Sequence, residues 1–176
     1  MLDTNYRNRA AVLKYAKRID AGNSVDDLDR APGFALCDAE VVLSSGTAKS
    51  ETLPRREAYA RLVQAIKDSG LPLSAIAVIL NTHDEINRAR EALCRAGIPT
   101  VLLDTFDGTA QAVNIGTIHR AKGMDFGAVF HLTDAPKTTA TAFTGADRDR
   151  AELAARQRMV ALTRARDYIW IGFMHD

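Results

Sequence analysis

The sequence predicts an α/β domain in which helices cover both faces of a mostly parallel sheet. Short apolar runs of strand length alternate along the chain with segments of helical periodicity that span ten or more residues. Parallel neighbours need crossover connections of about that length, which are usually helices. The chain has 176 residues, of which 47% are hydrophobic and 26% charged. This composition is typical of one globular domain with a substantial core.

The N-terminal third begins with an amphipathic segment, residues 6–19, whose apolar positions have helical spacing. A loop is expected over 23–33. Residues 34–45 predict one or two short strands, interrupted by the polar stretch 38–40. Residues 55–70 return to the helical period, and the glycine that closes them predicts a helix C-terminus.

The central part repeats a strand and helix pattern. Residues 74–80 form a continuous apolar run that is short enough to be a buried strand. Cap-type residues at 81–84 precede a helix expected over 85–97. Two more strands are expected over 98–104 and 112–119.

The C-terminal part predicts a strand over 127–134, a helix over 152–167 and a final strand over 168–173. Between the first two, residues 133–147 are rich in Thr and Ala and poor in large apolar side chains, so we expect a mobile loop there. No internal repeat is evident.

Charge and cysteine content exclude few function classes. Lys plus Arg total 23 against 22 Asp plus Glu, so net charge favours neither presence nor absence of a polyanionic partner. Cys37 and Cys94 lie far apart without metal-ligand spacing, which predicts buried free thiols rather than a zinc site or a disulfide. No signal peptide or membrane-span pattern is present, so we expect a cytoplasmic protein without a membrane partner.

Polar clusters follow two of the predicted strands. Asn81, Thr82 and His83 follow one, and Thr117 and His119 lie at the end of another. In open α/β sheets, ligands bind at the carboxyl ends of the strands. Thr117 and His119 are one residue apart, so we expect both side chains on one face of the sheet edge.

An anion site could follow at Lys122 and Gly123, because glycine lets backbone N–H groups approach an anion and lysine supplies a charge. A true P-loop needs GxxxxGK[ST], which the chain lacks. The nearest imitation, SGTAKS at 45–50, has no glycine directly before its lysine. Asp134 has no acidic neighbour and is interpreted as a strand end rather than a Walker B carboxylate.

Two arginine groups allow two interpretations. Arg156, Arg158, Arg164 and Arg166 form either a solvated basic face or, for one of them, a contact to a nucleotide's terminal phosphate. Tyr6 with Arg7 offers a second pair, with a ring for stacking and a guanidinium for phosphate.

The remaining polar patterns predict neither a metal site nor a hydrolase triad. His131 lies within a predicted strand and is interpreted as a satisfied core or edge residue, and His175 lies at the C-terminus. No Ser-His-Asp order or carboxylate pair stands out.

Three motifs in order resemble UvrD/Rep-type superfamily 1 DNA helicases. TIHRAKGMDF resembles the end of their motif V (here 113–126), VALTRARD their motif VI (159–167), and DTNYRN their motif IV (3–8). The stretch AIAVILNTHDEINRAREALCRAGIPTVLL (75–103) also resembles the strand-helix-strand that the family has between motifs IV and V. The resemblance spans nearly the whole chain.

The resemblance implies a single RecA-like domain over 1–176, the second motor domain (2A), with a three-layer fold. In the family, ATP with Mg²⁺ lies between two such domains, and the N-terminal motor domain mainly holds the Mg²⁺. By motif position, Tyr6 would stack on adenine, Arg7 and Arg164 would reach the γ-phosphate, and Asp125 would contact the ribose where relatives usually have Glu. Lys122 and Gly123 match nucleotide-binding positions.

Single-stranded DNA crosses both motor domains in the family. By position, its contacts here would be Asn81, Thr82, His83, Thr117 and His119, and relatives commonly have Arg where Asn81 stands.

The family's Walker A and B residues belong to the N-terminal motor domain, and only DTFDGTAQAV (104–113) stands where relatives insert a 2B domain. We therefore expect a piece of a larger helicase or a truncated relative, inactive as an ATPase alone. The alternative is a non-catalytic nucleic-acid-binding or regulatory module. A stand-alone nucleotide-binding enzyme is disfavoured because the chain has no P-loop.

Overall fold

The computed structural model describes residues 39–43, 46–105, 108–135 and 145–176. Predictions for 6–19 and 23–33, and for Tyr6, Arg7 and Cys37, lie outside these residues.

One seven-stranded sheet forms the centre of the domain, with the strand order β1-β2-β7-β6-β3-β5-β4. Only β1 is antiparallel to its neighbour, and every other pairing is parallel. The predicted mostly parallel sheet is thus confirmed. The strands are β1 (Ala39–Leu43), β2 (Gly46–Pro54), β3 (Ile76–Leu80), β4 (Thr100–Leu102), β5 (Val113–Thr117), β6 (Phe126–Asp134) and β7 (Ala165–His175).

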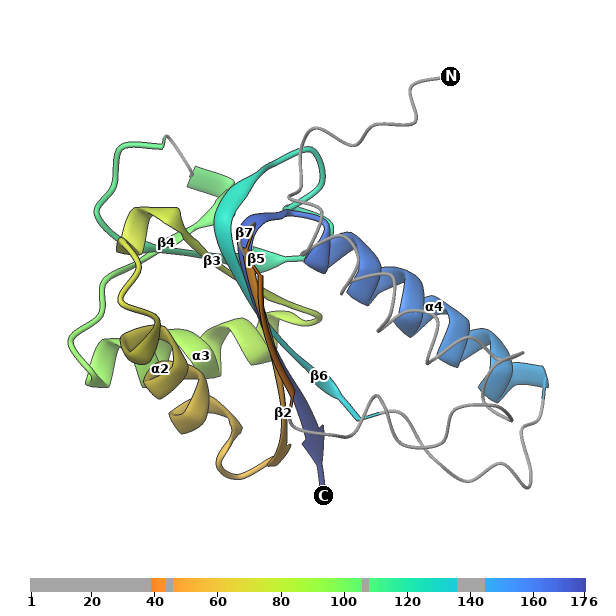
Figure 1. Cartoon of the computed structure of the whole chain (residues 1–176). Coiled ribbons are helices and arrows are strands. Elements are labelled where there is room, and N and C mark those ends of the chain that lie inside the picture. The colour runs from red at the N-terminus through yellow and green to blue at the C-terminus, as the bar shows by residue number, and fades with distance from the viewer. Residues whose placement is uncertain (1–38, 44–45, 106–107, 136–144) are drawn as a thin grey trace.

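Helices cover both faces of the sheet, which gives three layers (Figure 1). Helices α2 (Ala58–Ser69) and α3 (His83–Arg95) lie on one face, and α4 (Gly145–Leu162) lies on the other. Two short 3₁₀ turns, η2 (Leu73–Ala75) and η3 (Leu103–Thr105), complete the described helices. Each face has its own apolar cluster, because alternate strand residues point to opposite sides. The α/β fold class is therefore confirmed.

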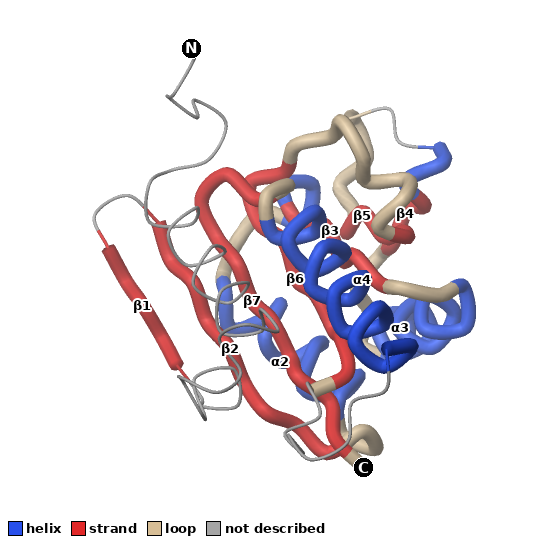
Figure 2. The backbone as a smooth tube through the Cα atoms, turned by 90° about the vertical axis from the view of Figure 1, so that its right-hand side faces the viewer, coloured by secondary structure: helices blue, strands red, loops and turns tan. Residues whose placement is uncertain are grey.

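The strands in the middle of the sheet are the most deeply buried, as the continuous apolar run at 74–80 predicts. All five residues of β3 are 0% exposed. Strand β3 lies between β6 and β5, so neither edge nor face of it meets water (Figure 2). The neighbouring β5 is buried throughout as well.

Strand β2 is the main element that the sequence prediction missed. Residues 45–50 suggest only an imperfect phosphate loop by sequence, but 47–54 pair with β7 in parallel over eight positions. Many of its side chains are polar, so the apolar signal of a strand is weak.

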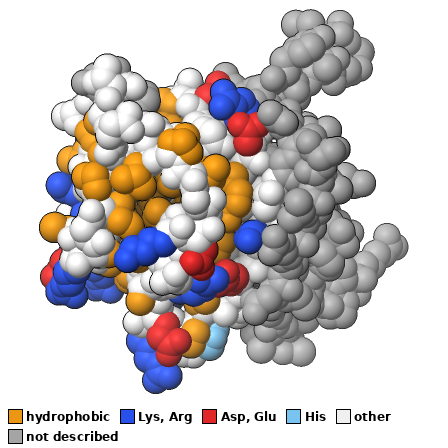
Figure 3. Space-filling model, turned by 60° about the vertical axis from the view of Figure 1, so that its left-hand side comes forward, with side chains coloured by type: hydrophobic (Ala, Val, Ile, Leu, Met, Phe, Trp, Pro, Cys, Tyr) orange, Lys and Arg blue, Asp and Glu red, His pale blue; other side chains and the backbone are white. Residues whose placement is uncertain are grey.

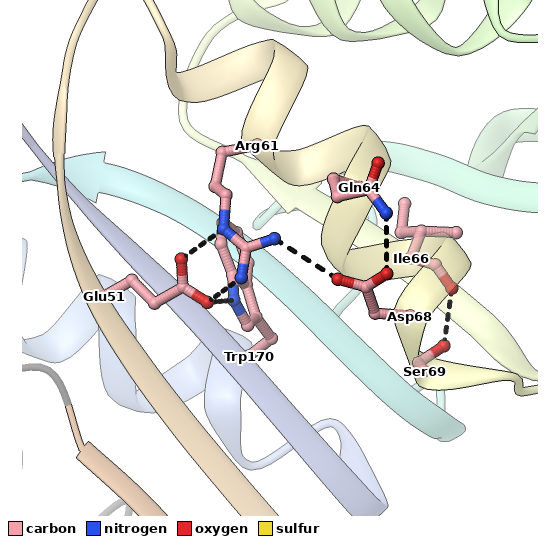
Figure 4. A network of polar contacts seen from close by, with 7 residues as sticks. All are labelled: Glu51, Arg61, Gln64, Ile66, Asp68, Ser69 and Trp170. Atoms are coloured by element: carbon pink, nitrogen blue, oxygen red, sulfur yellow. Dashed lines mark hydrogen bonds and ion pairs between the residues drawn. The ribbon is translucent and has the colours of Figure 1, made fainter.

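A polar contact network holds β2 against the sheet and α2 (Figure 4). The Glu51 carboxylate accepts hydrogen bonds from Arg61 Nε and Nη2, both at 2.6 Å, and from Trp170 Nε1 at 3.1 Å. A bidentate arginine–carboxylate pair is among the stronger side-chain hydrogen-bond arrangements. The Arg61 pKa is raised, mainly by its hydrogen bond to Glu51.

The predicted element boundaries shift at the helix ends. Helix α3 begins at His83 rather than 85, because Thr82 accepts from the Glu85 backbone N–H and the Glu85 side chain accepts from the Thr82 backbone N–H. Helix α2 ends as expected, with Gly70 in the left-handed region at φ 62°.

The predicted helix over 152–167 is wrong at its end. Helix α4 ends at Leu162 and β7 begins at Ala165, because Ala165 pairs with Phe126 in the sheet. Part of the predicted mobile loop over 133–147 is also regular, since β6 runs to Asp134 and α4 starts at Gly145.

Two further observations concern the predicted buried cysteine and the prediction of no membrane span. Cys94 is a free thiol, but it is exposed on α3 rather than buried as predicted. Among the helices that the structure describes, none combines the length and hydropathy needed to cross a bilayer.

Candidate functional sites

Residues 118–125 run along the α4 face of the sheet, from the carboxyl ends of the strands back to their amino ends. Thr117 pairs with Leu80 at the carboxyl end of β3, whereas Ala128 pairs with Ile76 at its amino end. Ile118, Ala121 and Met124 of this segment pack in the apolar cluster beneath α4. The crossover therefore divides the predicted site residues between two places: the carboxyl ends of the strands, here called the carboxyl edge, and their amino ends, here called the amino edge.

Tight turns make this short crossover possible. The Ala121 N–H donates to the Thr117 carbonyl at 3.1 Å, and the Met124 N–H donates to the Ala121 carbonyl at 3.1 Å. Gly123 has a φ of 80°, a conformation that residues with a side chain rarely adopt. This turn requirement is a structural reason for Gly123, independent of any ligand.

The carboxyl edge brings the two predicted DNA-contacting groups together. Asn81, Thr82 and His83 follow β3, and Thr117 ends the adjacent β5. The Ile118 N–H donates to the Leu80 carbonyl at 3.2 Å, which fixes the two strand ends side by side.

Structural roles account for part of this polar group. The Thr82 hydroxyl caps α3, and the Glu85 carboxylate accepts from the backbone N–H groups of Asn81 and Thr82, both at 2.9 Å. The Thr117 hydroxyl accepts from the Arg120 N–H at 3.4 Å. His83 and His119 are exposed.

The prediction that Thr117 and His119 lie on one face of a strand is wrong. Strand β5 ends at Thr117, so the alternation rule does not extend to His119. Thr117 is buried, whereas His119 is exposed in the following turn.

A hollow of about 50 Å³ lies at this edge, between β5, β4 and the start of α3. His83, Thr117, Asp104 and Arg120 are among its lining residues. Arg120 Nε lies 2.8 Å from Asp104 Oδ1, and both side chains are largely exposed. This pair has no signal in the sequence, since only the folded chain brings 104 and 120 together.

Gly116 also lies at this hollow, and its missing side chain is a packing requirement. A Cβ there would lie 2.7 Å from Leu103 Cδ1 and 2.9 Å from Leu103 Cβ. The close approach lets η3 rest against the end of β5.

The amino edge brings together parts of the two segments that resemble motifs V and VI. The Phe126 N–H donates to the Arg164 carbonyl at 2.9 Å, so the turn that contains Asp125 lies beside the connection from α4 to β7. Lys122, Gly123 and Asp125 are all exposed. A ligand at this edge could therefore meet both chain segments.

Arg164 is half-buried and folds back over the end of its own helix. Its Nε donates to the Val160 carbonyl at 3.2 Å, and its Nη2 donates to the Thr163 hydroxyl at 3.3 Å. Carbonyl groups at a helix C-terminus favour a cation. Both of these acceptors are neutral, and a charge-assisted hydrogen bond to a phosphate is stronger than a bond to either of them.

The other three arginines of this region differ in environment. Arg156 and Arg166 are exposed and pair with Glu152 and Asp167, as a solvated basic face predicts. Arg158 is only 5% exposed, which rules it out of such a face.

His131 is a core residue, as predicted, but its hydrogen bonding is only half satisfied, because Nε2 has no partner among the described residues. It is fully buried, and its Nδ1 lies 2.6 Å from the Ile79 carbonyl oxygen. Burial, together with the positive charge of Arg158, lowers the pKa of His131 to about 4, although the Ile79 contact opposes this shift. The imidazole is therefore neutral near neutral pH. His175 ends β7, with Nδ1 3.1 Å from the Asp176 backbone oxygen.

Within the ranges that the structure describes, no three His, Cys, Asp or Glu side chains are grouped so that they could hold a metal ion. The residues at the amino edge offer a carboxylate and cationic groups, which suit a nucleotide's ribose and phosphates.

One protein family and one solved structure are similar to this chain. Residues 106–176 match the family described as the UvrD-like helicase C-terminal domain, so the resemblance drawn from the motifs is confirmed for this part of the chain. No curated protein sequence matches the chain.

Among solved structures, the chain is similar to the C-terminal domain of a possible DNA helicase from Lactobacillus plantarum. The TM-score is 0.62 at 17% sequence identity, and the match covers 97% of this chain and 88% of that one. At this identity the likeness establishes a shared fold.

Proposed function

From this similarity, we propose that the chain acts as the C-terminal motor domain of an ATP-dependent DNA helicase. A separate N-terminal motor domain would supply the P-loop and hold most of the Mg²⁺ contacts. The observation that supports this most directly is the division of the motif residues between two sheet edges, joined by the crossover 118–125. One edge would face ATP, and the other would face single-stranded DNA.

At the amino edge, Arg164 would stabilise the charge that develops on the transferring phosphoryl group. An arginine in this role contributes roughly 10³ to 10⁵ in rate in other nucleotide hydrolases. Its present acceptors, the Val160 carbonyl and the Thr163 hydroxyl, hold the guanidinium near the end of α4.

The neighbouring turn would hold the rest of the nucleotide. Asp125 would accept a hydrogen bond from the ribose, and Lys122 with the backbone of Gly123 would lie toward the phosphates. Tyr6 and Arg7, by their place in the motif IV resemblance, would add adenine stacking and a second γ-phosphate contact.

The sequence contains no P-loop, the element that holds the β- and γ-phosphates in P-loop nucleotide hydrolases. We therefore propose that hydrolysis requires the N-terminal motor domain as a partner.

At the carboxyl edge, Asn81, Thr82, His83, Thr117 and His119 would contact a DNA strand. The backbone N–H groups of 81 and 82 are already used by Glu85, so the side chains of His83 and His119 are the more accessible donors. Contacts of this kind reach phosphates and sugars, and hence do not depend on base sequence.

The crossover offers a physical link between the two edges. It begins just after Thr117, packs under α4 and ends at Asp125, so a displacement at one end would be transmitted through a short, packed segment. Coupling of nucleotide state to DNA grip requires such an element with contacts at both sites.

The direct test joins this chain to a P-loop motor domain and measures ATP hydrolysis with and without single-stranded DNA. Arg164→Ala should lower the turnover rate by at least roughly 10³. Arg166→Ala is the matched control, because Arg166 lies two residues away, is exposed and pairs with Asp167. If Arg164→Ala turned over like the unmodified protein, the role of Arg164 would be wrong, and the non-catalytic binding module would become the better account.

A further inference from the structure

A second basic hollow lies on the α2 and α3 side of the molecule, away from the residues assigned above. It has a volume of about 790 Å³ and is formed by the end of β2, the start of α2, one face of α3 and the end of β7. Its lining includes Arg55, Arg56, Tyr59, Arg88 and Arg95, and also the carboxylates of Glu91 and Asp176, so arginines outnumber acidic side chains by four to two. No motif in the sequence accounts for four arginines around one tyrosine.

The arginines are available to an incoming anion. Among the described residues, Arg88 has no ion-pair partner. Arg56 pairs with Glu57 at 3.1 Å and Arg95 pairs with Glu91, but all four of these side chains are more than half exposed. Exposed pairs of this kind contribute little to stability, so an anionic ligand can replace their carboxylates at small cost.

Arg55 is the more firmly held member. It lies 2.7 Å from Asp134 and 3.0 Å from Asp176, and its pKa is raised mainly by the hydrogen bond to Asp134. We therefore assign anion contact to Arg56, Arg88 and Arg95, and regard Arg55 as a wall of the hollow.

Tyr59 supplies an aromatic surface within this basic setting. It lies in the first turn of α2, is half-buried and packs at the margin of the core. The combination of a ring with surrounding cations is the pattern by which proteins hold single-stranded nucleic acid without sequence preference: bases stack on the ring and phosphates meet the cations.

The hollow opens at the same edge of the sheet as the proposed DNA contacts. Pro54 of β2 pairs with His175 of β7, and both lie at the carboxyl ends of their strands. Strand β2 is three places from β3 in the sheet, which corresponds to roughly 14 Å. A strand that crosses His83 could therefore continue across β6 and β7 into the hollow. Figure 3 views this side, where Lys and Arg side chains are frequent in the lower half and interleaved with Asp and Glu.

We propose that this hollow is a second binding site for single-stranded nucleic acid, in which a base stacks on Tyr59 and Arg88 contacts the backbone phosphate. The site would extend the path along the carboxyl edge to the face of α3 that lines the hollow. An acidic peptide is the competing occupant; it could pair with the arginines, but it would make no use of the Tyr59 ring that lines the hollow beside them.

The test uses the whole 176-residue chain and fluorescence anisotropy of a labelled oligonucleotide over a range of salt concentrations. Arg88→Ala should raise the Kd at least roughly fivefold and lower the slope of log K against log salt by about 0.7, the value for one lost single-strand phosphate contact. Arg90→Ala is the matched control, because Arg90 is exposed on the same helix but does not line the hollow. Equal effects of the two variants would overturn the proposal, since they would reflect net charge alone.

Tyr59 gives an independent readout. Tyr59→Phe should keep the affinity, whereas Tyr59→Leu should weaken it by roughly fivefold or more, because only the second variant removes the stacking surface. Thermal unfolding of both variants identifies any loss that comes from misfolding, and in that case the Arg88 result decides. Affinity unchanged in Tyr59→Leu would also overturn the stacking role.

The result separates this proposal from the proposed function. His119→Ala tests the motif-based DNA contact, and Arg88→Ala tests the hollow. Loss only in His119→Ala would leave the proposed function standing and overturn the second site. Loss only in Arg88→Ala would leave the second site standing and overturn the motif-based DNA contact. An acidic peptide that competes in an Arg88-dependent way, while the oligonucleotide shows no Arg88 dependence, would assign the hollow to a protein partner instead.

Discussion

The backbone N–H of Phe126 donates a 2.9 Å hydrogen bond to the carbonyl oxygen of Arg164. This bond starts the pairing of β6 with β7, and it joins the end of the crossover to the turn after α4. Residues that lie 38 positions apart in sequence thus meet at one edge of the sheet. The proposed nucleotide contacts Asp125 and Arg164 depend on this pairing for their proximity.

Single-stranded DNA binding by the chain alone should depend on His119. His119→Ala should cost about 1 kcal/mol, or roughly fivefold in Kd, the effect of one hydrogen bond. Fluorescence anisotropy at low salt measures it, with Arg156→Ala as the control, because Arg156 is exposed on α4 on the opposite side of the sheet from α2 and α3. A larger loss in the control than in His119→Ala would move the binding surface to α4.

Thr82 should contribute to stability through its cap rather than mainly through DNA. Its hydroxyl accepts from the Glu85 N–H at 3.3 Å. Thr82→Ala should lower the free energy of unfolding by about 1 kcal/mol, whereas Thr82→Ser should keep most of it because the capping oxygen remains. Urea denaturation of the three proteins checks this. Equal losses in both variants would show that the methyl group, not the cap, matters.

The stability of the domain should fall as the pH falls from about 6.5 towards 4. The folded-state pKa of His131 is about 4, below its ordinary value of 6.5, because the ring is buried near Arg158. In this window the unfolded state binds the proton more strongly, so acid favours unfolding, and the contribution is fully present above the unfolded pKa. Between about pH 7 and pH 5 the loss should be on the order of 2 kcal/mol.

His131→Gln provides the comparison for this effect, since glutamine can keep a polar contact but does not titrate. Its free energy of unfolding should vary less between the two pH values than that of the unmodified chain. An identical pH dependence in both proteins would mean that other groups cause the acid destabilisation.

Gly116→Ala should destabilise the domain by about 1–3 kcal/mol, because the added methyl group overlaps Leu103. The double variant with Leu103→Ala should recover part of that loss beyond the additive expectation, since two of the three close contacts are to Leu103 Cγ and Cδ1. Chemical denaturation of the two single variants and the double variant gives the coupling free energy. A coupling near zero would contradict the packing account of Gly116.

The buried elements of this fold were readable from the sequence. A continuous apolar run at 76–80 favours a central strand that is covered on both faces. In the structure this run is β3, which is buried and lies between β6 and β5. Strand β2 was not readable, because its polar side chains are stabilised by partners far away in sequence, such as Arg61 and Trp170 for Glu51. The end of α4 was misplaced for a similar reason, since Ala165 leaves the helical pattern to pair with Phe126.

The candidate sites show the same division. The strand and helix pattern placed Asn81 to His83 and Thr117 at strand ends, and the structure puts those ends side by side. The local pattern could not predict that Arg120 would meet Asp104, nor that Arg88 of α3 would share a hollow with Tyr59 of α2. Those contacts follow from the packing of separate elements.

The central claim is that the two sheet edges carry separate tasks, and one assay of the two-domain protein tests it. ATP hydrolysis and oligonucleotide binding should be measured together for Arg164→Ala and His119→Ala. We expect Arg164→Ala to lose hydrolysis and keep DNA binding, and His119→Ala to keep basal hydrolysis while needing more DNA for stimulation. If Arg164→Ala lost DNA binding and His119→Ala lost basal hydrolysis, the assignment of the edges would be reversed and the account would fail.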